Sequence, residues 1–336
     1  VAEPGEYTKR AFLNGKINLI QAESVAQLIN AKSIEAAKQQ TKNLSGGVTK
    51  KIKTLKRDLI LSLAHLEYEL DVSEEVFLDA NTLIKLKKNL KDALNFANSI
   101  TDTFDKGAAL AYGVKIAFVG KPNVGKSTLV NKILGVDKSI TSDTPGTTRD
   151  IVSTETTMNG TPVLLLDTAG IHNPKDNIEA EGIKRALDEI QSADLVVSLF
   201  CKGTKPVDIK GLKKQIYVYN KIDLSPYTGG KKEVFMVSAT TGQGLNSLIN
   251  HIKEKIGFIR VDAAEPLITT IRQKNAMLGI SSHLTSALRL LNENGKEIEL
   301  PAQEIRSAID NIDLFTGKTT TNDILDQVFS SFCVGK

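Results

Sequence analysis

The segment VKIAFVGKPNVGKST, from Val114 to Thr128, constrains the fold of this chain more than any other. A short apolar run rich in β-forming residues precedes a turn of the form G-x-x-x-x-G-K-[ST], and STLVNKIL then makes a good helix start. In such a turn, backbone N–H groups and the helix N-terminus bind phosphate. Lys126 would reach the β and γ oxygens, and Ser127 would bind Mg²⁺. The segment therefore predicts a phosphate-binding loop between a strand and a helix.

The region around this loop contains repeated short apolar runs. Six such runs follow one another between 114 and 239, and helical patterns separate most of them. Asn159-Gly160, between the second run and the third, is a strong hairpin signal and predicts one antiparallel pair. Between 201 and 215 there is little room for a full helix with its loops. We therefore expect a six-stranded, mostly parallel sheet with helices on both faces.

Helical periodicity dominates both sides of this α/β block. Apolar residues recur at spacings of three and four between Ile52 and Leu70, within a helical stretch over 17–70 that Gly46-Gly47 interrupts. A second amphipathic stretch covers 82–110, and Leu278, Leu284, Leu288 and Leu291 mark another helix after the block, followed by two more at 302–312 and 322–332. We expect an α/β domain inserted into an all-α helical domain. The expected boundaries are 1–112 and 259–336 for the helical domain and 113–258 for the α/β domain.

Composition excludes several classes of protein. The formal net charge of +4 over 336 residues is too small to argue for a nucleic-acid partner by itself. Cys201 and Cys333 lie far apart and indicate neither a disulfide framework nor a cysteine zinc site. No apolar run approaches the roughly 20 residues of a membrane-spanning helix, and no signal peptide is visible. We expect a cytoplasmic protein without membrane contact.

Basic residues gather on the long helical pattern that begins near residue 47. They are Lys50, Lys51, Lys53, Lys56 and Arg57. A solvated helix face is the favoured interpretation of such a run, and a nucleic-acid-binding patch is the alternative.

Asp167 ends a hydrophobic run at the start of the segment DTAG. This is the place of the acidic residue that orients Mg²⁺-bound water in phosphoryl-transfer sites, and the N–H of Gly170 would then sense the γ-phosphate. A plain turn residue at a strand end is the alternative for Asp167. In Ras-like GTPases a glutamine commonly follows this glycine and holds the attacking water, but here the residue is Ile171. Another group must replace that glutamine if the chain hydrolyses a nucleotide.

The segment NKID, from Asn220 to Asp223, predicts recognition of guanine. A carboxylate at Asp223 accepts from the ring N–H and the exocyclic amine of guanine, whereas adenine offers neither donor there. Asn220 and Lys221 would pack the base and connect it to the phosphate loop, and SAT at 238–240 places a backbone N–H near the guanine oxygen. The order of these motifs makes GTP and GDP the expected ligands.

The motifs, together with SDTPGTTRD at 142–150, resemble the translation-factor class of GTPases, in the group that includes Era, Der and MnmE (TrmE). PGEYTKRAFLNGKINLIQAE at 4–23 and FCVGK at 332–336 are similar to the MnmE family, and the resemblance covers essentially the whole chain. It implies a Ras-like GTPase domain inserted into a helical domain. The family's N-terminal folate-binding domain has no counterpart in this sequence. The segment 201–215 is shorter than the family leads us to expect.

The resemblance implies a K⁺-dependent GTPase that modifies carbon 5 of the tRNA wobble uridine. It further implies a homodimer, a heterotetramer with a flavin-dependent MnmG-type partner, and a folate one-carbon carrier bound by the full-length protein. An Era- or Der-like ribosome-assembly switch is the alternative function. A helical scaffold with an inert nucleotide domain is a third possibility.

The nucleotide site expected from the motifs and the resemblance comes from five stretches of chain. Its residues are Asn123, Val124, Gly125, Lys126, Ser127, Thr128, Ser142, Asp143, Thr144, Pro145, Gly146, Thr147, Thr148, Asp167, Thr168, Ala169, Gly170, Asn220, Lys221, Asp223, Ser238, Ala239 and Thr240. Ser127 and Thr148 are the expected direct Mg²⁺ ligands, and Asp167 acts through water.

The resemblance also implies a K⁺ ion beside the phosphates. Its ligands would be the Asn123 side chain, the carbonyl groups of Ser142 and Thr144, and Thr147, since carbonyl oxygens suit K⁺. The cation would neutralise charge on the transferring phosphoryl group, as an arginine finger does elsewhere. A simple turn residue is the alternative for Asn123.

Glu179 matches the family's proposed catalytic glutamate, which orients the attacking water. Glu181 is the nearby competitor, and a solvated acid at a helix start is the alternative for either residue. Cys333, with Lys336, would lie at the modification site near the folate, and a buried inert thiol is its alternative. Lys16 is similar to a lysine that contacts folate in the family.

Overall fold

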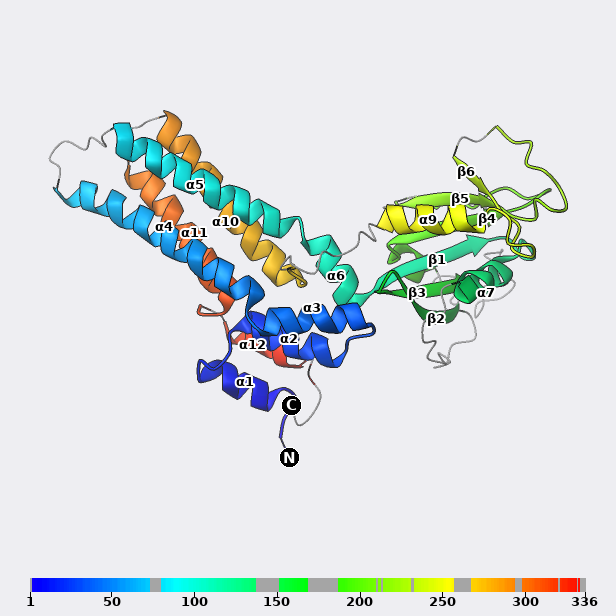
Figure 1. Ribbon diagram of the computed structural model, residues 1–336, viewed down its shortest axis with the longest axis horizontal. Coiled ribbons are helices and arrows are strands. Elements are labelled where there is room, and N and C mark those ends of the chain that lie inside the picture. Colours follow the sequence, from blue (N-terminus) through cyan, green and yellow to red (C-terminus); the bar gives the residue numbers. More distant parts are fainter. Residues whose placement is uncertain are drawn as a thin grey trace. The chain divides into compact units, whose positions relative to one another are not determined.

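The computed structural model describes residues 2–72, 80–136, 151–168, 187–209, 211–212, 214–230, 233–256, 267–293, 298–319, 321–330 and 332. The chain divides into two compact units. One unit combines Val1–Ala111 with Asp262–Lys336 and is helical, whereas the other, Tyr112–Val261, contains the sheet (Figure 1). The predicted insertion of an α/β domain into a helical one is confirmed.

The sheet has six strands in the order β2-β3-β1-β4-β5-β6. Their bounds are β1 Val114–Gly120, β2 Ile151–Met158, β3 Thr161–Thr168, β4 Leu195–Phe200, β5 Gln215–Tyr219 and β6 Val234–Met236. Only β2 runs antiparallel to its neighbour, and it is joined to β3 through Asn159 and Gly160, whose φ angles of 50° and 81° form the tight turn that the sequence predicts. The mostly parallel sheet is confirmed, and the central strand β1 is buried on both faces.

The helices α7 (Lys126–Val136) and α9 (Leu245–Ile256) belong to this α/β unit. Between β4 and β5, the described residues 201–209, 211–212 and 214 contain no helix. Instead, Val207, Ile209 and Leu212 pack against a buried cluster formed by sheet residues such as Val119 and Val196. The side chain of Ser198 donates to the Val207 carbonyl and accepts from its N–H, at 2.8 and 3.0 Å. An irregular segment therefore covers a sheet face that a helix would cover in an ordinary βαβ crossover.

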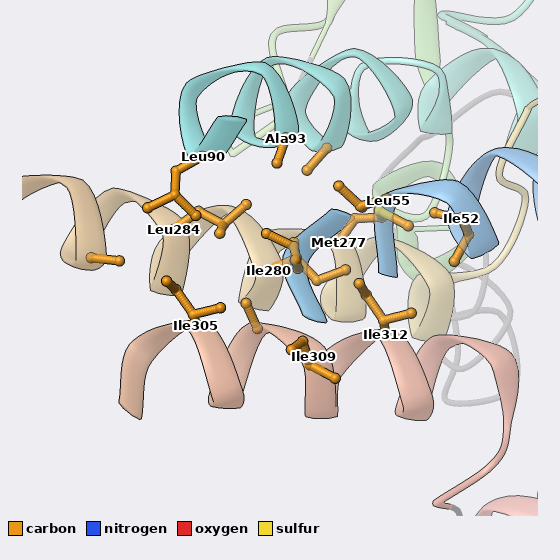
Figure 2. Close-up of a cluster of buried hydrophobic side chains, with 14 of the residues drawn as sticks. Ile52, Leu55, Leu90, Ala93, Met277, Ile280, Leu284, Ile305, Ile309 and Ile312 are labelled. Carbon is orange, nitrogen blue, oxygen red and sulfur yellow. The ribbon is translucent and has the colours of Figure 1, made fainter. Parts of the chain in front are cut away.

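The helical unit is built around four long helices. The helix bounds are α1 Glu6–Leu13, α2 Leu19–Ile29, α3 Ile34–Leu44, α4 Gly47–Val72, α5 Ala80–Thr101, α6 Phe104–Tyr112, α10 Ile271–Glu293, α11 Glu299–Thr316 and α12 Asn322–Ser330. Figure 2 shows side chains of α4, α5, α10 and α11 that point toward one another in the core, among them Leu55, Leu90, Ile280 and Ile305. The core thus joins helices that precede the α/β unit in the chain with helices that follow it.

Three details of the helical pattern differ from expectation. The stretch 82–110 forms two helices, α5 and α6, because the chain turns at Asp102 and Thr103. The interruption at Gly46-Gly47 is present, but a second one, at 30–33, separates α2 from α3. Leu278 is 47% exposed, whereas Leu284 is fully buried, so the apolar face of α10 is narrower at its start than the leucine pattern suggests.

Candidate functional site

The predicted phosphate loop connects β1 to α7 and has the backbone that this role needs. Asn123 and Gly125 have φ angles of 63° and 93°. A Cβ at Gly120 would lie 2.4 Å from the carbonyl oxygen of Leu199, and one at Gly125 would lie 2.4 Å from Nδ2 of Asn220. Neither position tolerates a side chain, because the neighbouring strand and side chain approach the loop too closely. The loop is therefore held tightly against the carboxyl end of the sheet.

Lys126 is the first residue of α7 and is 8% exposed. Its Nζ donates to the carbonyl oxygens of Gly120 and Lys121, at 3.0 and 3.3 Å. Burial lowers the pKa of Lys126, and the negative charge of Asp167 opposes that shift. The ammonium group is thus placed across the loop in a site where a phosphate would stabilise its charge.

Asp167 lies on β3 opposite Phe118 of β1 and is half-buried. Ser127 and Thr128 follow Lys126 in the first turn of α7 and are exposed. Hydroxyl and carboxylate oxygens are the ligands that Mg²⁺ prefers. The residues present therefore fit a Mg²⁺ ion held by Ser127 and, through water, by Asp167.

Asn220 connects the loop to the base-reading segments. It is 1% exposed and follows β5 directly. Its Nδ2 donates to the carbonyl oxygen of Val124 at 2.9 Å, and its Oδ1 accepts from the N–H of Ala239 at 3.0 Å. Lys221, with φ of 67°, donates from Nζ to the carbonyl oxygen of Asn123 at 2.7 Å. Two adjacent side chains therefore tie the phosphate loop to the turn that carries Asp223.

The turn after Asn220 leaves Asp223 exposed. The N–H groups of Leu224 and Ser225 both donate to the Lys221 carbonyl at 3.1 Å, so this turn is closed by its own backbone. Ser238 is fully buried, and its Oγ accepts from the N–H of Thr241 at 3.1 Å. Hydrogen bonds thus fix the backbone of the turn that carries Asp223 and of the segment 238–240. The Asp223 carboxylate itself stays accessible to a base.

An aromatic cluster beside this turn was not expected from the sequence. The ring of Tyr227 lies 5.0 Å from that of Tyr219 and 5.9 Å from that of Phe200, between ring centroids. Tyr219 precedes Asn220, and Tyr227 follows Asp223, so the cluster anchors both ends of the turn. The available signal was aromatic residues at the carboxyl ends of two neighbouring strands.

Part of the expected site lies outside the described residues. This holds for Ser142, Asp143, Thr144, Pro145, Gly146, Thr147, Thr148, Ala169, Gly170, Glu179, Cys333 and Lys336. Thr168 ends β3, but its side chain is not described, and Thr240 is exposed. Lys16 belongs to the helical unit, where it is exposed. In the described part of the chain, no three His, Cys, Asp or Glu residues form a metal-binding group.

The sheet order, the phosphate loop and the Asn-Lys-x-Asp turn define the class of protein: a P-loop GTPase domain, here inserted into a helical unit. The sequence model of the MnmE helical domain matches residues 19–333. The protein named tRNA modification GTPase MnmE from Thermotoga maritima is 36% identical over 359 residues, which cover 100% of this chain and 78% of that protein. Its namesake from Thermosipho melanesiensis is 37% identical over 348 residues, covering 100% and 77%. The chain belongs to the MnmE family.

Solved structures resemble parts of the chain. Era from Aquifex aeolicus, bound to GDP and AlF₄⁻, is 28% identical over 50% of this chain and 66% of its own, with a TM-score of 0.34. The G domain of the Thermotoga maritima FeoB iron transporter is 27% identical over 45% of this chain and 99% of its own, with a TM-score of 0.32. Scores of this size carry no argument about the arrangement of the chain.

Among the described residues, no helix combines the length and the apolar character that crossing a membrane requires.

Proposed function

We propose that this chain hydrolyses GTP in the modification of carbon 5 of the tRNA wobble uridine. The observation that carries the proposal is the Asn220 side chain, which joins the phosphate loop at Val124 to the base-reading segment at Ala239. This side chain therefore connects the segment proposed to bind phosphate with the segment proposed to bind guanine. The name tRNA modification GTPase, carried by relatives that match the whole chain, supports the tRNA part.

The residues of the expected nucleotide site have distinct roles in this proposal. Asp223 accepts two hydrogen bonds from guanine, and Lys126 donates to the β and γ phosphate oxygens. Ser127 and Thr148 would hold Mg²⁺ directly, and Asp167 would hold it through water. When bound, Mg²⁺ would neutralise charge on the phosphate oxygens. Because adenine lacks the two donors, a bound ATP would leave the Asp223 carboxylate unpaired.

A K⁺ ion and Glu179 are proposed to replace the missing glutamine at Ile171. Asn123 is exposed in the loop, and its left-handed backbone places its carbonyl on Lys221. Its side chain, with Ser142, Thr144 and Thr147, would hold the cation, which supplies positive charge beside the phosphates. Glu179 would orient the attacking water through a bridging water.

Single-turnover GTP hydrolysis at several protein concentrations, in K⁺ and in Na⁺, tests this proposal. We expect faster turnover in K⁺ and a rate that rises with protein concentration, since the GTPase domains of the proposed homodimer would activate each other. Equal rates in the two salts would overturn the role of K⁺. Glu179→Ala should abolish turnover and preserve GTP binding, while the matched control Glu181→Ala should keep both.

The further partners of this function belong to the same proposal. They are a flavin-dependent protein in a heterotetramer, tRNA, and a folate carrier near Lys16, Lys336 and Cys333, in the cytoplasm. Affinity purification from the native cell should recover a flavoprotein. Recovery of ribosomal subunits without a flavoprotein would favour a ribosome-assembly role instead.

A further inference from the structure

A cavity of about 670 Å³ lies in the helical unit, and its lining includes no residue of the nucleotide site. Its walls come from the segment between α1 and α2, from the start of α4 and from the end of α11. The charged residues that line it are Lys16, Lys50, Lys53, Lys56, Lys318 and Asp313. Five cations and one carboxylate therefore face the same space.

Only one of these lysines is neutralised within the cavity. Nζ of Lys56 lies 2.5 and 2.6 Å from the two carboxylate oxygens of Asp313, and both side chains are mostly buried. Lys16, Lys50, Lys53 and Lys318 are exposed and have no ion pair within the part of the chain that the structure describes. The cavity therefore carries an excess of positive charge that an anionic ligand would neutralise.

The polar groups beneath the lysines are satisfied without a ligand. Asn18 accepts from the N–H of Gln21 at 2.9 Å and donates from Nδ2 to Oγ1 of Thr49 at 2.8 Å. The side chain of Gln21 donates to the carbonyl oxygen of Leu44 at 2.7 Å. The floor is therefore held by its own hydrogen bonds, and a ligand would be recognised through the lysines at the rim.

The position of Lys318 at the rim is set by the backbone. Gly317, with φ of 85°, ends α11, and the N–H groups of Gly317 and Lys318 donate to the Asp313 carbonyl at 2.9 and 2.8 Å. This helix end holds Lys318 on the same cavity as Lys50 and Lys53, which lie one turn apart on α4. The lysines come from segments far apart in sequence, so the fold rather than the run of basic residues gathers them.

A second cavity of the helical unit, of about 520 Å³, has no excess of positive charge. It lies between α4 and α5, and its charged lining residues are Lys51, Asp58 and Asp92. Asp58 also pairs with Arg57 at 3.1 Å. The acids there outnumber the lysine, so this cavity does not favour an anion. The basic run on α4 is thus divided between two environments.

We propose that the lysine-lined cavity binds the phosphodiester backbone of RNA, as a docking site for the tRNA substrate on the helical unit. The inference rests on the proposed function for the identity of the RNA. Lysine ammonium groups bind phosphate as point charges, and each phosphate that they neutralise releases counterions. A volume of this size accommodates more than a single ion. For Lys50 and Lys53, the proposal takes the alternative interpretation of the basic run, a nucleic-acid-binding patch.

The test is fluorescence anisotropy of a labelled tRNA anticodon stem-loop titrated with the protein at several KCl concentrations. The cavity variant is Lys50→Gln, Lys53→Gln and Lys318→Gln together. The matched control is Lys85→Gln, Lys88→Gln and Lys91→Gln, which removes the same charge from exposed positions on α5 of the same unit. The circular dichroism spectrum and the unfolding midpoint in urea should be unchanged in both variants, which shows that the helical unit of each is folded. Intrinsic GTP hydrolysis without RNA should also be unchanged, because the substitutions lie outside the α/β unit.

We expect the cavity variant to raise the Kd for RNA by at least about tenfold and to reduce the slope of log K against log salt by about two to three, as loss of three phosphate contacts requires. The control should change Kd less than about twofold. Equal weakening in both variants, no weakening in either, or displacement of the RNA by pyrophosphate at equal concentration would overturn the inference. Failure of the unmodified protein to bind any RNA would overturn the proposed function as well.

Discussion

At the scale of single residues, the nucleotide site depends on side chains that bind backbone groups of distant segments. Asn220 and Lys221 follow one another in sequence, and each holds a different carbonyl group of the phosphate loop. Lys126 is turned onto the same loop from the opposite end. These contacts fix the loop before any nucleotide is bound, so little ordering is needed on binding.

Loss of the Asn220 side chain should destabilise the α/β unit. Asn220→Ala leaves the buried carbonyl of Val124 and the N–H of Ala239 without their partner, and each unpaired buried group costs about 1–3 kcal/mol. Urea unfolding of the protein, followed with and without GDP, measures this loss. Thr240→Ala, at an exposed neighbouring position, should change the free energy of unfolding by less than about 0.5 kcal/mol. Equal effects of the two substitutions would contradict the role given to Asn220.

GTP binding should take up protons at alkaline pH. Burial lowers the pKa of Lys126 below its ordinary value near 10.5, so a fraction of the free protein carries a neutral amine between the two values. A bound phosphate raises the pKa again, and the amine then gains a proton. Well below the lowered pKa, Lys126 is charged in both states and contributes no uptake.

Isothermal titration calorimetry in buffers of different ionisation enthalpy measures this uptake directly. In the unfolded chain Lys126 has its ordinary pKa near 10.5, so between the lowered pKa and that value the unfolded chain binds more protons than the folded protein. The free energy of unfolding of the nucleotide-free protein should therefore increase as pH rises through this range. Lys121→Met removes an exposed neighbouring lysine and should leave the uptake intact. Proton release on GTP binding at alkaline pH would contradict the assignment.

At the scale of secondary-structure elements, a buried ion pair joins helices that are far apart in sequence. Glu23 of α2 is 6% exposed and accepts from Nε and Nη2 of Arg272 of α10, at 2.8 and 2.9 Å. Nη1 of Arg272 also donates to the carbonyl oxygens of Leu314 and Phe315 near the end of α11. One guanidinium group therefore fastens three helices, as a planar donor with five N–H groups can.

Arg272→Met should destabilise the helical unit by about 3–5 kcal/mol, because Glu23 is left as a buried charge without its partner. Guanidinium unfolding followed by circular dichroism measures the change. Arg289→Met is the matched control, since Arg289 pairs with Glu293 on the surface of α10, and its loss should cost less than about 1 kcal/mol. Similar losses of unfolding free energy in the two variants would show that the buried ion pair stabilises the unit no more than the surface pair does.

At the scale of the whole molecule, the helical unit is assembled from two separate parts of the chain. Its core places α4 and α5 against α10 and α11, which lie on either side of the α/β unit in sequence. The two parts also meet near the points where the chain leaves and returns. A Cβ at Gly107 would lie 2.0 Å from the carbonyl oxygen of Ile268, so α6 and the start of the second part are in direct contact.

The two units should therefore differ in their ability to fold from one continuous segment. A fragment of residues 112–261 contains its whole core and should fold and bind GDP, whereas a fragment of residues 1–111 lacks α10 and α11 and should not. Nuclear magnetic resonance spectra and binding of a fluorescent GDP analogue distinguish these outcomes. Joining 2–111 to 267–336 with a short Gly-Ser linker should restore the helical unit, because Gly107 and Ile268 touch. A folded 1–111 fragment would contradict this view of the core.

Much of the fold was predictable from local sequence patterns. The apolar runs become the six strands, and Asn159-Gly160 forms the expected turn, because strand and turn preferences act over a few residues. The position of the phosphate loop between a strand and a helix was equally readable. The division of 82–110 into two helices and the irregular cover between β4 and β5 were not, since neither has a strong local signal.

The sequence by itself determined the chemical types at the nucleotide site: a lysine and serine after glycine, an acid at a strand end, and an Asn-Lys-x-Asp turn. Only the tertiary structure decided that Asn220 bridges Val124 and Ala239, that Tyr227 anchors the base-reading turn, and that Lys50 and Lys318 face one cavity. A motif consists of residues close together in sequence, so it can be recognised from the sequence alone. Contacts between residues that belong to different motifs depend on how the buried faces of helices and strands pack, and that packing exists only in the folded chain.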